Sequence, residues 1–136
     1  MRRPVTLGIV GGGVMGEALV RGLLRARVLR PSQLVVAEAR PERARVLRRR
    51  YRIRTVEEAS ALGARVSSLV IAVKPQDAEA AFAQLGTSVA PGTLIISIVA
   101  GWRTDRIARF VGPQPVVRVM PNTPALAGHG MAAVAA

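Results

Sequence analysis

The chain contains no cysteine and very few aromatic residues: one Trp, one Tyr and two Phe among 136 residues. The absence of cysteine excludes disulfide scaffolds, cysteine nucleophiles and metal sites built from thiolates, and it agrees with a reducing, cytoplasmic environment. We expect no metal site. Because aromatic residues make up only 3% of the chain while hydrophobic residues make up 50%, the core must consist of Val, Leu, Ile and Ala.

The sequence also lacks a long, continuous apolar segment. Residues 80–102 carry no charge, but Gly86, Pro91 and Gly92 interrupt their apolar character. The first residues, Met1-Arg2-Arg3, are followed by an apolar stretch that is rich in glycine and has no small-residue cleavage site. We therefore expect neither a membrane span nor secretion.

Acidic residues are scarce and lysine is nearly absent. The chain has 20 basic and 8 acidic residues, a formal net charge of +12, and Lys74 as its single lysine. Eight arginines lie between Arg40 and Arg54, a cluster that either attracts phosphate groups or forms a solvated helix face. Tyr51 is the only aromatic residue nearby that a nucleic-acid base could stack on, so we do not expect nucleic-acid binding.

Apolar runs and amphipathic segments alternate along the chain. The patterns predict strands over residues 5–10, 33–38, 53–55, 67–73, 92–100 and 115–120, with another strand starting in 131–135, and helices over 14–28, 41–51, 57–62, 75–85 and 104–110. Such alternation with short connections is typical of a doubly wound α/β fold, in which helices cover both faces of a mostly parallel sheet. The length suits one compact domain, residues 1–136, with no second domain.

A glycine motif lies between the first predicted strand and the first predicted helix. Gly11, Gly13 and Gly16 fit G-x-G-x-x-G, and Glu38 follows 22 residues after Gly16 at the end of the second strand. In this context the first glycine permits the tight turn, the second allows a pyrophosphate to approach, and the third allows close packing of helix and strand. The sequence therefore predicts a Rossmann-type dinucleotide site.

The residues after the second strand leave the choice of dinucleotide open. Glu38 can accept hydrogen bonds from the adenosine ribose, which favours NAD, or it can simply pair with neighbouring arginines. Arg40 and Arg43 can bind the 2′-phosphate of NADP. Because arginine outnumbers acid here, NADPH is slightly favoured over NADH.

Four segments together resemble one known family. With "GIVGGGVMGEAL", "VIAVKPQD", "SIVAG" and "VRVMPNTPALAGHG" in this order, the chain resembles the N-terminal domain of pyrroline-5-carboxylate reductase over essentially its whole length. The resemblance implies an oxidoreductase that transfers a hydride from NAD(P)H to the C=N bond of 1-pyrroline-5-carboxylate, giving L-proline in proline biosynthesis. Alternatives are a non-catalytic NAD(P)-binding relative and a dehydrogenase of the β-hydroxyacid type.

The resemblance and the glycine motif assign a set of site residues. Those expected to bind the cofactor are Gly11, Gly13, Val14, Met15, Gly16, Glu38, Arg40, Ala72, Val73, Lys74, Pro75, Ala100, Gly101, Met120 and Pro121. Asn122 and Thr123 are expected to contact the carboxamide or the substrate, although such residues also form turns. Lys74 either neutralises phosphate or lies solvated at a helix start.

This sequence departs from the family pattern in three respects. Val14 stands where relatives commonly carry a polar residue, and His129, the single histidine, is expected to be a surface loop residue rather than a catalytic one. The family also has a second, all-helical domain that forms a homo-oligomer and supplies much of the substrate pocket. Because the chain stops before that domain, we expect it to bind the cofactor and to reduce pyrroline poorly by itself.

Overall fold

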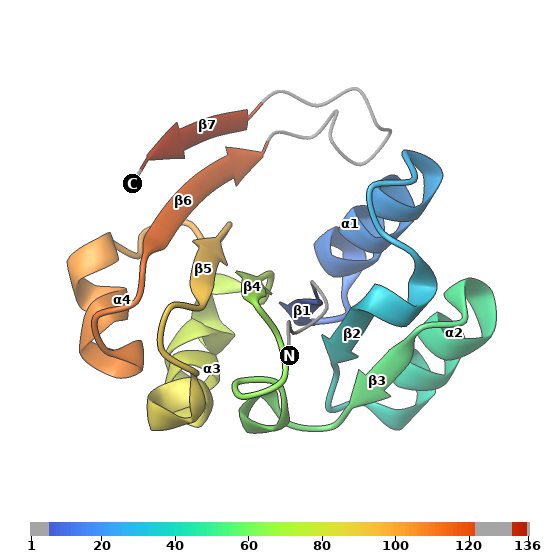
Figure 1. Ribbon diagram of the computed structural model, residues 1–136, viewed down its shortest axis with the longest axis horizontal. Coiled ribbons are helices and arrows are strands. Elements are labelled where there is room, and N and C mark those ends of the chain that lie inside the picture. The colour runs from blue at the N-terminus through green and yellow to red at the C-terminus, as the bar shows by residue number, and fades with distance from the viewer. Residues whose placement is uncertain (1–5, 122–131, 136) are drawn as a thin grey trace.

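The computed structural model describes residues 6–121 and 132–135, which form a seven-stranded sheet (Figure 1). Its strands are β1 (Leu7–Val10), β2 (Leu34–Ala37), β3 (Arg54–Val56), β4 (Ser68–Ile71), β5 (Leu94–Ser97), β6 (Val116–Pro121) and β7 (Ala132–Ala135). Their order is β3-β2-β1-β4-β5-β6-β7. Neighbouring strands from β1 to β6 are parallel, and only β7 is antiparallel.

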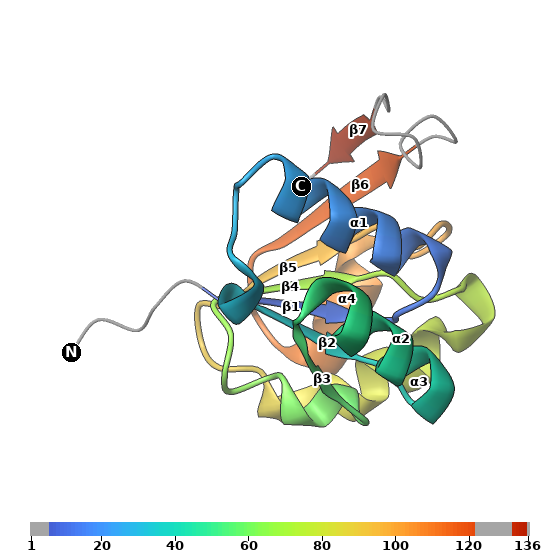
Figure 2. The same cartoon turned by 90° about the vertical axis from the view of Figure 1, so that its right-hand side faces the viewer.

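In the described part of the chain, four α-helices cover the two faces of the sheet (Figures 1 and 2). The helices α1 (Val14–Arg25) and α2 (Pro41–Tyr51) lie over one face, and α3 (Ala78–Leu85) and α4 (Thr104–Val111) over the other. The connections between strands and helices contain short 3-10 turns: η1 (Pro31–Gln33), η2 (Ala59–Ala61), η3 (Pro75–Asp77) and η4 (Gly86–Ser88). The predicted doubly wound α/β fold is thereby confirmed. Among the described residues, none of the helices is long and apolar enough to span a bilayer.

The central strands are buried on both faces, as their continuous apolar runs require. In β2 all four residues are buried, and successive side chains enter two different cores. Leu34 and Val36 pack in the cluster beneath α1 and α2, whereas Val35 and Ala37 pack in the cluster on the side of α3 and α4. The second cluster also holds the single tryptophan, Trp102.

Three predicted helices differ from the structure. In the helix predicted over residues 75–85, the first three residues form the 3-10 turn η3 and only Ala78–Leu85 are α-helical. The helix predicted over residues 14–28 ends at Arg25, because the Arg27 and Val28 amides bond back to the Leu24 and Leu23 carbonyls and Arg27 adopts a left-handed φ of 55°. This is a Schellman ending with arginine where glycine is usual. The helix predicted over 57–62 is only the 3-10 turn η2, which is too short for an α-helix.

The strand order reverses direction beside β1, which lies between β2 and β4. Because the connections from these two neighbours leave toward opposite faces, a crevice opens at the carboxyl ends of the strands, where ligands of doubly wound sheets bind. The loops that follow β1, β2 and β4 therefore meet at one edge of the sheet.

The packing of α1 against the first turn generates a test of the fold. A Cβ on Gly16 would lie 2.0 Å from the Gly11 carbonyl oxygen, so we expect Gly16→Ala to force α1 away from β1 and to lower the free energy of unfolding by about 3 kcal/mol. Gly22 is the matched control in the same helix, because a Cβ there meets nothing within 4 Å. Gly22→Ala should raise stability by about 0.5–1 kcal/mol. Urea unfolding followed by Trp102 fluorescence measures both, and equal effects of the two substitutions would contradict the packing argument.

Candidate functional site

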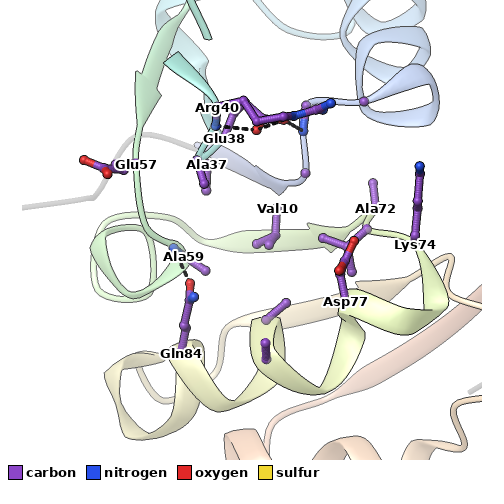
Figure 3. A pocket seen from close by; sticks show the side chains of 17 residues that line it. Val10, Ala37, Glu38, Arg40, Glu57, Ala59, Ala72, Lys74, Asp77 and Gln84 are labelled. Atoms are coloured by element: carbon purple, nitrogen blue, oxygen red, sulfur yellow. Dashed lines mark hydrogen bonds and ion pairs between the residues drawn. The ribbon is translucent and has the colours of Figure 1, made fainter. Parts of the chain in front are cut away.

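A hollow of about 470 Å³ lies at the carboxyl ends of β1, β2 and β4. The glycine turn, residues 11–13, forms part of its wall. Glu38 and Arg40 line one side and Lys74 and Asp77 the other (Figure 3). The hollow therefore combines the backbone of the glycine turn with two cationic and three acidic side chains, the latter from Glu38, Glu57 and Asp77.

Each glycine of the motif has a different spatial constraint. Gly11 adopts a φ of 105°, and a Cβ there would lie 2.7 Å from the Ala72 carbonyl oxygen. Gly16 is held against the Gly11 carbonyl, as described above. A Cβ on Gly13 would meet only Arg40 Nη2, at 3.9 Å, so the approach to this backbone from the hollow is open. Gly13 is also the N-cap of α1, which begins with no capping side chain.

Glu38 is buried and receives four donors. The Gly12 amide donates to its Oε1 at 3.1 Å, and the Arg40 amide donates to its Oε2 at 2.8 Å. The Arg40 guanidinium adds Nε to Oε2 at 3.2 Å and Nη2 to Oε1 at 3.1 Å. Burial opposes ionisation, but the bonds from Arg40 and Gly12 outweigh it and lower the pKa of Glu38.

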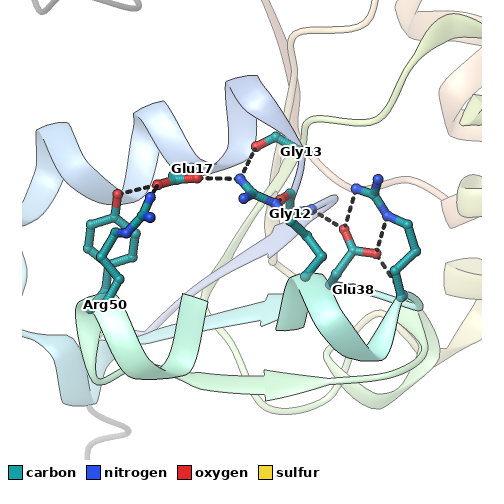
Figure 4. A network of polar contacts seen from close by, with 8 residues as sticks. Gly12, Gly13, Glu17, Glu38 and Arg50 are labelled. Carbon is teal, nitrogen blue, oxygen red and sulfur yellow. Dashed lines mark hydrogen bonds and ion pairs between the residues drawn. The ribbon is translucent and has the colours of Figure 1, made fainter. Parts of the chain in front are cut away.

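Arg43 joins α2 to the glycine turn and to α1. Its partners Gly12, Gly13 and Glu17 are labelled in Figure 4. Its Nε donates to the Gly12 carbonyl at 2.6 Å, and its Nη2 donates to the Gly13 carbonyl at 3.5 Å and to Glu17. These bonds occupy the guanidinium on the far side of the turn from Glu38. Of the two arginines predicted to contact a 2′-phosphate, Arg43 uses its guanidinium for these bonds within the protein. Arg40 lines the hollow, and its side chain is 63% exposed.

Glu17 is the acceptor at the centre of this contact between helices. Besides Arg43, it receives Arg50 Nη1 at 2.7 Å and the Tyr51 hydroxyl at 2.5 Å. Burial of the carboxylate raises its pKa, but the bonds from Tyr51, Arg43 and Arg50 outweigh this effect and lower the pKa of Glu17 to about 2. The carboxylate therefore remains ionised in the folded protein at neutral pH.

The structure brings about half of the predicted site residues into the hollow. Its lining includes Gly11, Gly13, Glu38, Arg40, Ala72, Val73 and Lys74. Gly16 packs below the turn, and Val14 projects into solvent with 72% exposure. Met15, Pro75, Ala100, Gly101, Met120 and Pro121 do not line this hollow, although the last four lie at or beyond the carboxyl ends of β5 and β6. Asn122, Thr123 and His129 lie outside the described residues.

Several lining residues were not predicted from the sequence. Gly12 donates to Glu38, and Asp77 and Gln84 face the hollow from η3 and α3. Residues 77, 80, 81 and 84 have the spacing of one helix face directly after the Lys74-Pro75 segment, which is a usable signal for a helix bordering the site. Gly12 gave no such signal, because the motif leaves its position unspecified.

Comparisons with known proteins agree with this geometry. Residues 6–101 match the family described as NADP oxidoreductase, coenzyme F420-dependent. The chain is 39% identical over 133 residues to a pyrroline-5-carboxylate reductase of Synechocystis sp., covering 97% of the chain and 49% of that protein. The Coxiella burnetii pyrroline-5-carboxylate reductase structure, at 24% identity, shares the fold with a TM-score of 0.89 over 96% of the chain and 48% of its own. A Plasmodium falciparum pyrroline carboxylate reductase with NADP bound matches with 26% identity and a TM-score of 0.81, covering 99% of the chain and 49% of its own.

The pKa of Glu17 predicts a pH-dependent contribution to stability. Since folding lowers this pKa from 4.5 to about 2, the contribution is complete above pH 4.5 and is lost as the pH falls toward 2. We expect Glu17→Gln to lower the free energy of unfolding by about 1–3 kcal/mol at pH 7, and the difference from the unsubstituted chain to shrink between pH 4.5 and 2. Glu57→Gln is the control, because Glu57 is exposed and forms no ion pair among the described residues. A difference that stays constant with pH would rule out the ionised Glu17 contact.

Proposed function

The chain belongs to the family described as NADP oxidoreductase, coenzyme F420-dependent, and on this premise we propose that it binds NADPH or NADH in the hollow beside the glycine turn, with NADPH favoured. The observation that carries the proposal is the combination of open backbone at Gly13 with the exposed guanidinium of Arg40 on the same wall. The open backbone suits the pyrophosphate that both nucleotides carry, and the guanidinium suits the 2′-phosphate that only NADPH carries.

The first turn of α1 fits the pyrophosphate. Gly13 has no side chain to block the approach, and the uncapped helix start offers N–H groups and the positive end of the helix dipole. Lys74, on the opposite wall, adds positive charge toward the same ligand. In this arrangement the backbone of Val14 and Met15 contributes amides, so the apolar side chain of Val14 is no obstacle.

The environment of Glu38 supports the preference for NADPH. A carboxylate has about four acceptor positions, and all four contacts of Glu38 are made by Gly12 and Arg40. The ribose hydroxyls of NADH would have to displace the Arg40 guanidinium to reach this carboxylate. The 2′-phosphate of NADPH instead offers Arg40 a second anionic partner at the exposed side of the pair.

The remaining predicted contacts follow the carboxyl edge of the sheet. We assign the path of the cofactor to the segment Ala72-Val73-Lys74-Pro75, then to Ala100 and Gly101, and finally to Met120 and Pro121. The first two segments follow β4 and β5, and Met120 and Pro121 are the last residues of β6. Because β4, β5 and β6 are parallel neighbours, their carboxyl ends form a continuous edge. Asn122 and Thr123 come directly after β6 and are proposed to orient the carboxamide or the substrate.

The proposed reaction is reduction of the C=N bond of 1-pyrroline-5-carboxylate to L-proline. When bound, the nicotinamide would supply the hydride to the imine carbon. A protonated imine is already electrophilic, so the chain's residues need only hold the reacting groups together and exclude water. The relatives named pyrroline-5-carboxylate reductase support this substrate, and the proposal extends to a cytoplasmic enzyme that works as a homo-oligomer.

The chain spans about half the length of the curated relatives it matches. We therefore propose that the 136 residues act as the dinucleotide-binding domain and that reduction of the imine by this chain alone is weak. Calorimetric titration with NADPH and with NADH, at low and high salt, tests the first statement. Saturable binding of NADPH at both salt concentrations supports it, and a folded chain that binds neither nucleotide contradicts it.

Substitution of Arg40 tests the nucleotide preference. We expect Arg40→Gln to weaken NADPH binding by roughly 10- to 100-fold, because charge-assisted hydrogen bonds to the 2′-phosphate are lost, and to leave NADH binding unchanged or slightly stronger. Arg45→Gln is the matched control, since this exposed arginine lies on α2 outside the hollow and removes the same charge. If both variants weaken NADPH binding equally, general electrostatic attraction rather than Arg40 determines the preference.

A further inference from the structure

A second hollow, of about 710 Å³, lies at the opposite edge of the sheet. Thr6 precedes β1 and Arg65 precedes β4, so the hollow lies at the amino ends of these parallel strands. It also extends along the edge strand β3, all three residues of which line it. The hollow beside the glycine turn lies at their carboxyl ends. The two hollows share no lining residue.

The second hollow has an apolar floor and a cationic rim. Val35 and Ile53 in the floor are buried, whereas Arg48, Arg54 and Arg65 at the rim are exposed. These arginines come from three different elements: α2, β3 and the loop before β4. The fold thus brings together cationic side chains that are up to 17 positions apart in the sequence.

No acidic residue neutralises this rim. Within the part of the chain that the structure describes, no Asp or Glu lines the hollow, and none of its three arginines forms an ion pair. Other arginines of the same sequence cluster are paired: Arg40 with Glu38, and both Arg43 and Arg50 with Glu17. The structure therefore separates the arginines that stabilise the glycine turn from those that lie around the second hollow.

Arg48 is already oriented at the rim. Its Nη1 donates to the Thr55 hydroxyl at 2.6 Å, and this bond joins α2 to the edge strand β3. The bond uses one of the five N–H donors of the guanidinium. A planar guanidinium that is held in this way matches two phosphate oxygens and loses less side-chain entropy on binding.

We propose that the second hollow is a binding site for a small polyphosphate, free or attached to an organic group, separate from the dinucleotide site. The three arginines that line the hollow provide the charge for two or more phosphate groups, and the volume is within the range of small-molecule sites. A nucleic-acid strand fits the surface less well. Trp102, Phe82 and Phe110 pack in one interior cluster, and the Tyr51 hydroxyl bonds Glu17, so no described aromatic ring offers a stacking surface beside the hollow.

Calorimetric titration of the 136-residue chain with inorganic tripolyphosphate tests the site. The test variant is Arg48→Gln/Arg54→Gln/Arg65→Gln, and the control is Arg45→Gln/Arg49→Gln/Arg109→Gln, which removes the same charge from exposed positions outside both hollows. We expect one site per chain that depends on the rim arginines, with at least about a tenfold loss of affinity at that site in the test variant and less than about a threefold loss in the control. The single variant Arg65→Gln, in a loop, provides the same comparison with a smaller loss if the triple variant does not fold.

Three results would overturn the proposal. Equal losses in the test and control variants would mean that net charge alone attracts the probe. Loss of tripolyphosphate binding in Arg40→Gln, with the test variant unaffected, would place the probe in the hollow beside the glycine turn. If a short single-stranded oligothymidylate binds more tightly than tripolyphosphate, and this binding depends on the rim arginines, the surface binds nucleic acid instead.

A comparison with uridine triphosphate distinguishes the two sources of the phosphate groups. Tighter binding of uridine triphosphate than of tripolyphosphate, lost in the test variant, would assign the apolar floor to an organic group. Equal binding of the two, also lost in the test variant, would assign the site to the phosphates alone. Both results support the site, and neither depends on whether NADPH binds the other hollow.

Discussion

The close contact between Gly16 and the Gly11 carbonyl sets how near α1 lies to β1, and the rest of the site depends on that distance. A Cβ on Gly16 would lie 2.0 Å from that oxygen, so only a glycine allows α1 to begin directly above the end of β1. At that separation Gly13, the N-cap of α1, lies on the wall of the hollow. A wider separation would move the helix dipole away from the place where the strand ends meet.

Two buried carboxylates then fix the turn from opposite sides. Glu38 accepts from the Gly12 amide, while Glu17, through Arg43, holds the Gly12 carbonyl. The chain has only 8 acidic residues, and two of them hold the glycine turn, Glu38 directly and Glu17 through Arg43. Since both pKa values are lowered, the two carboxylates stay ionised and their arginine partners keep a defined orientation at neutral pH.

Much of the fold could be predicted from local sequence patterns. The α2 helix begins at Pro41 and ends at Tyr51 as predicted, because proline at the first position and the apolar spacing both mark it. The β2 strand was recognisable from its continuous apolar run. By contrast, the end of α1 was placed too late because Arg27 occupies a left-handed position, for which arginine gives no signal.

The site was only partly predictable because its decisive contacts are non-local. Glu17 reads as an ordinary charged residue in the first turn of an amphipathic helix, and its partners Arg43 and Tyr51 come 26 and 34 positions later. The glycine motif predicts a place for a pyrophosphate, but it does not predict which groups bond to Glu38. Only the structure shows that Arg40 takes both oxygens of that carboxylate.

An arginine that packs against the glycine turn can bond its carbonyl oxygens, which an apolar side chain cannot do. Replacing a buried ion pair by apolar residues of similar volume is often neutral or stabilising, so the Glu17–Arg43 contact is not required for stability as such. An apolar pair, however, could not donate to the Gly12 and Gly13 carbonyls. Arg43 binds both of these oxygens on the side of α2. In a planar trans peptide, the carbonyl of one residue and the N–H of the next point in opposite directions. Holding the Gly12 and Gly13 oxygens toward α2 therefore limits the directions of the Gly13 and Val14 N–H groups. Arginine at position 43 thus orients the backbone that an anionic ligand would contact, although its own guanidinium takes no part in the contact.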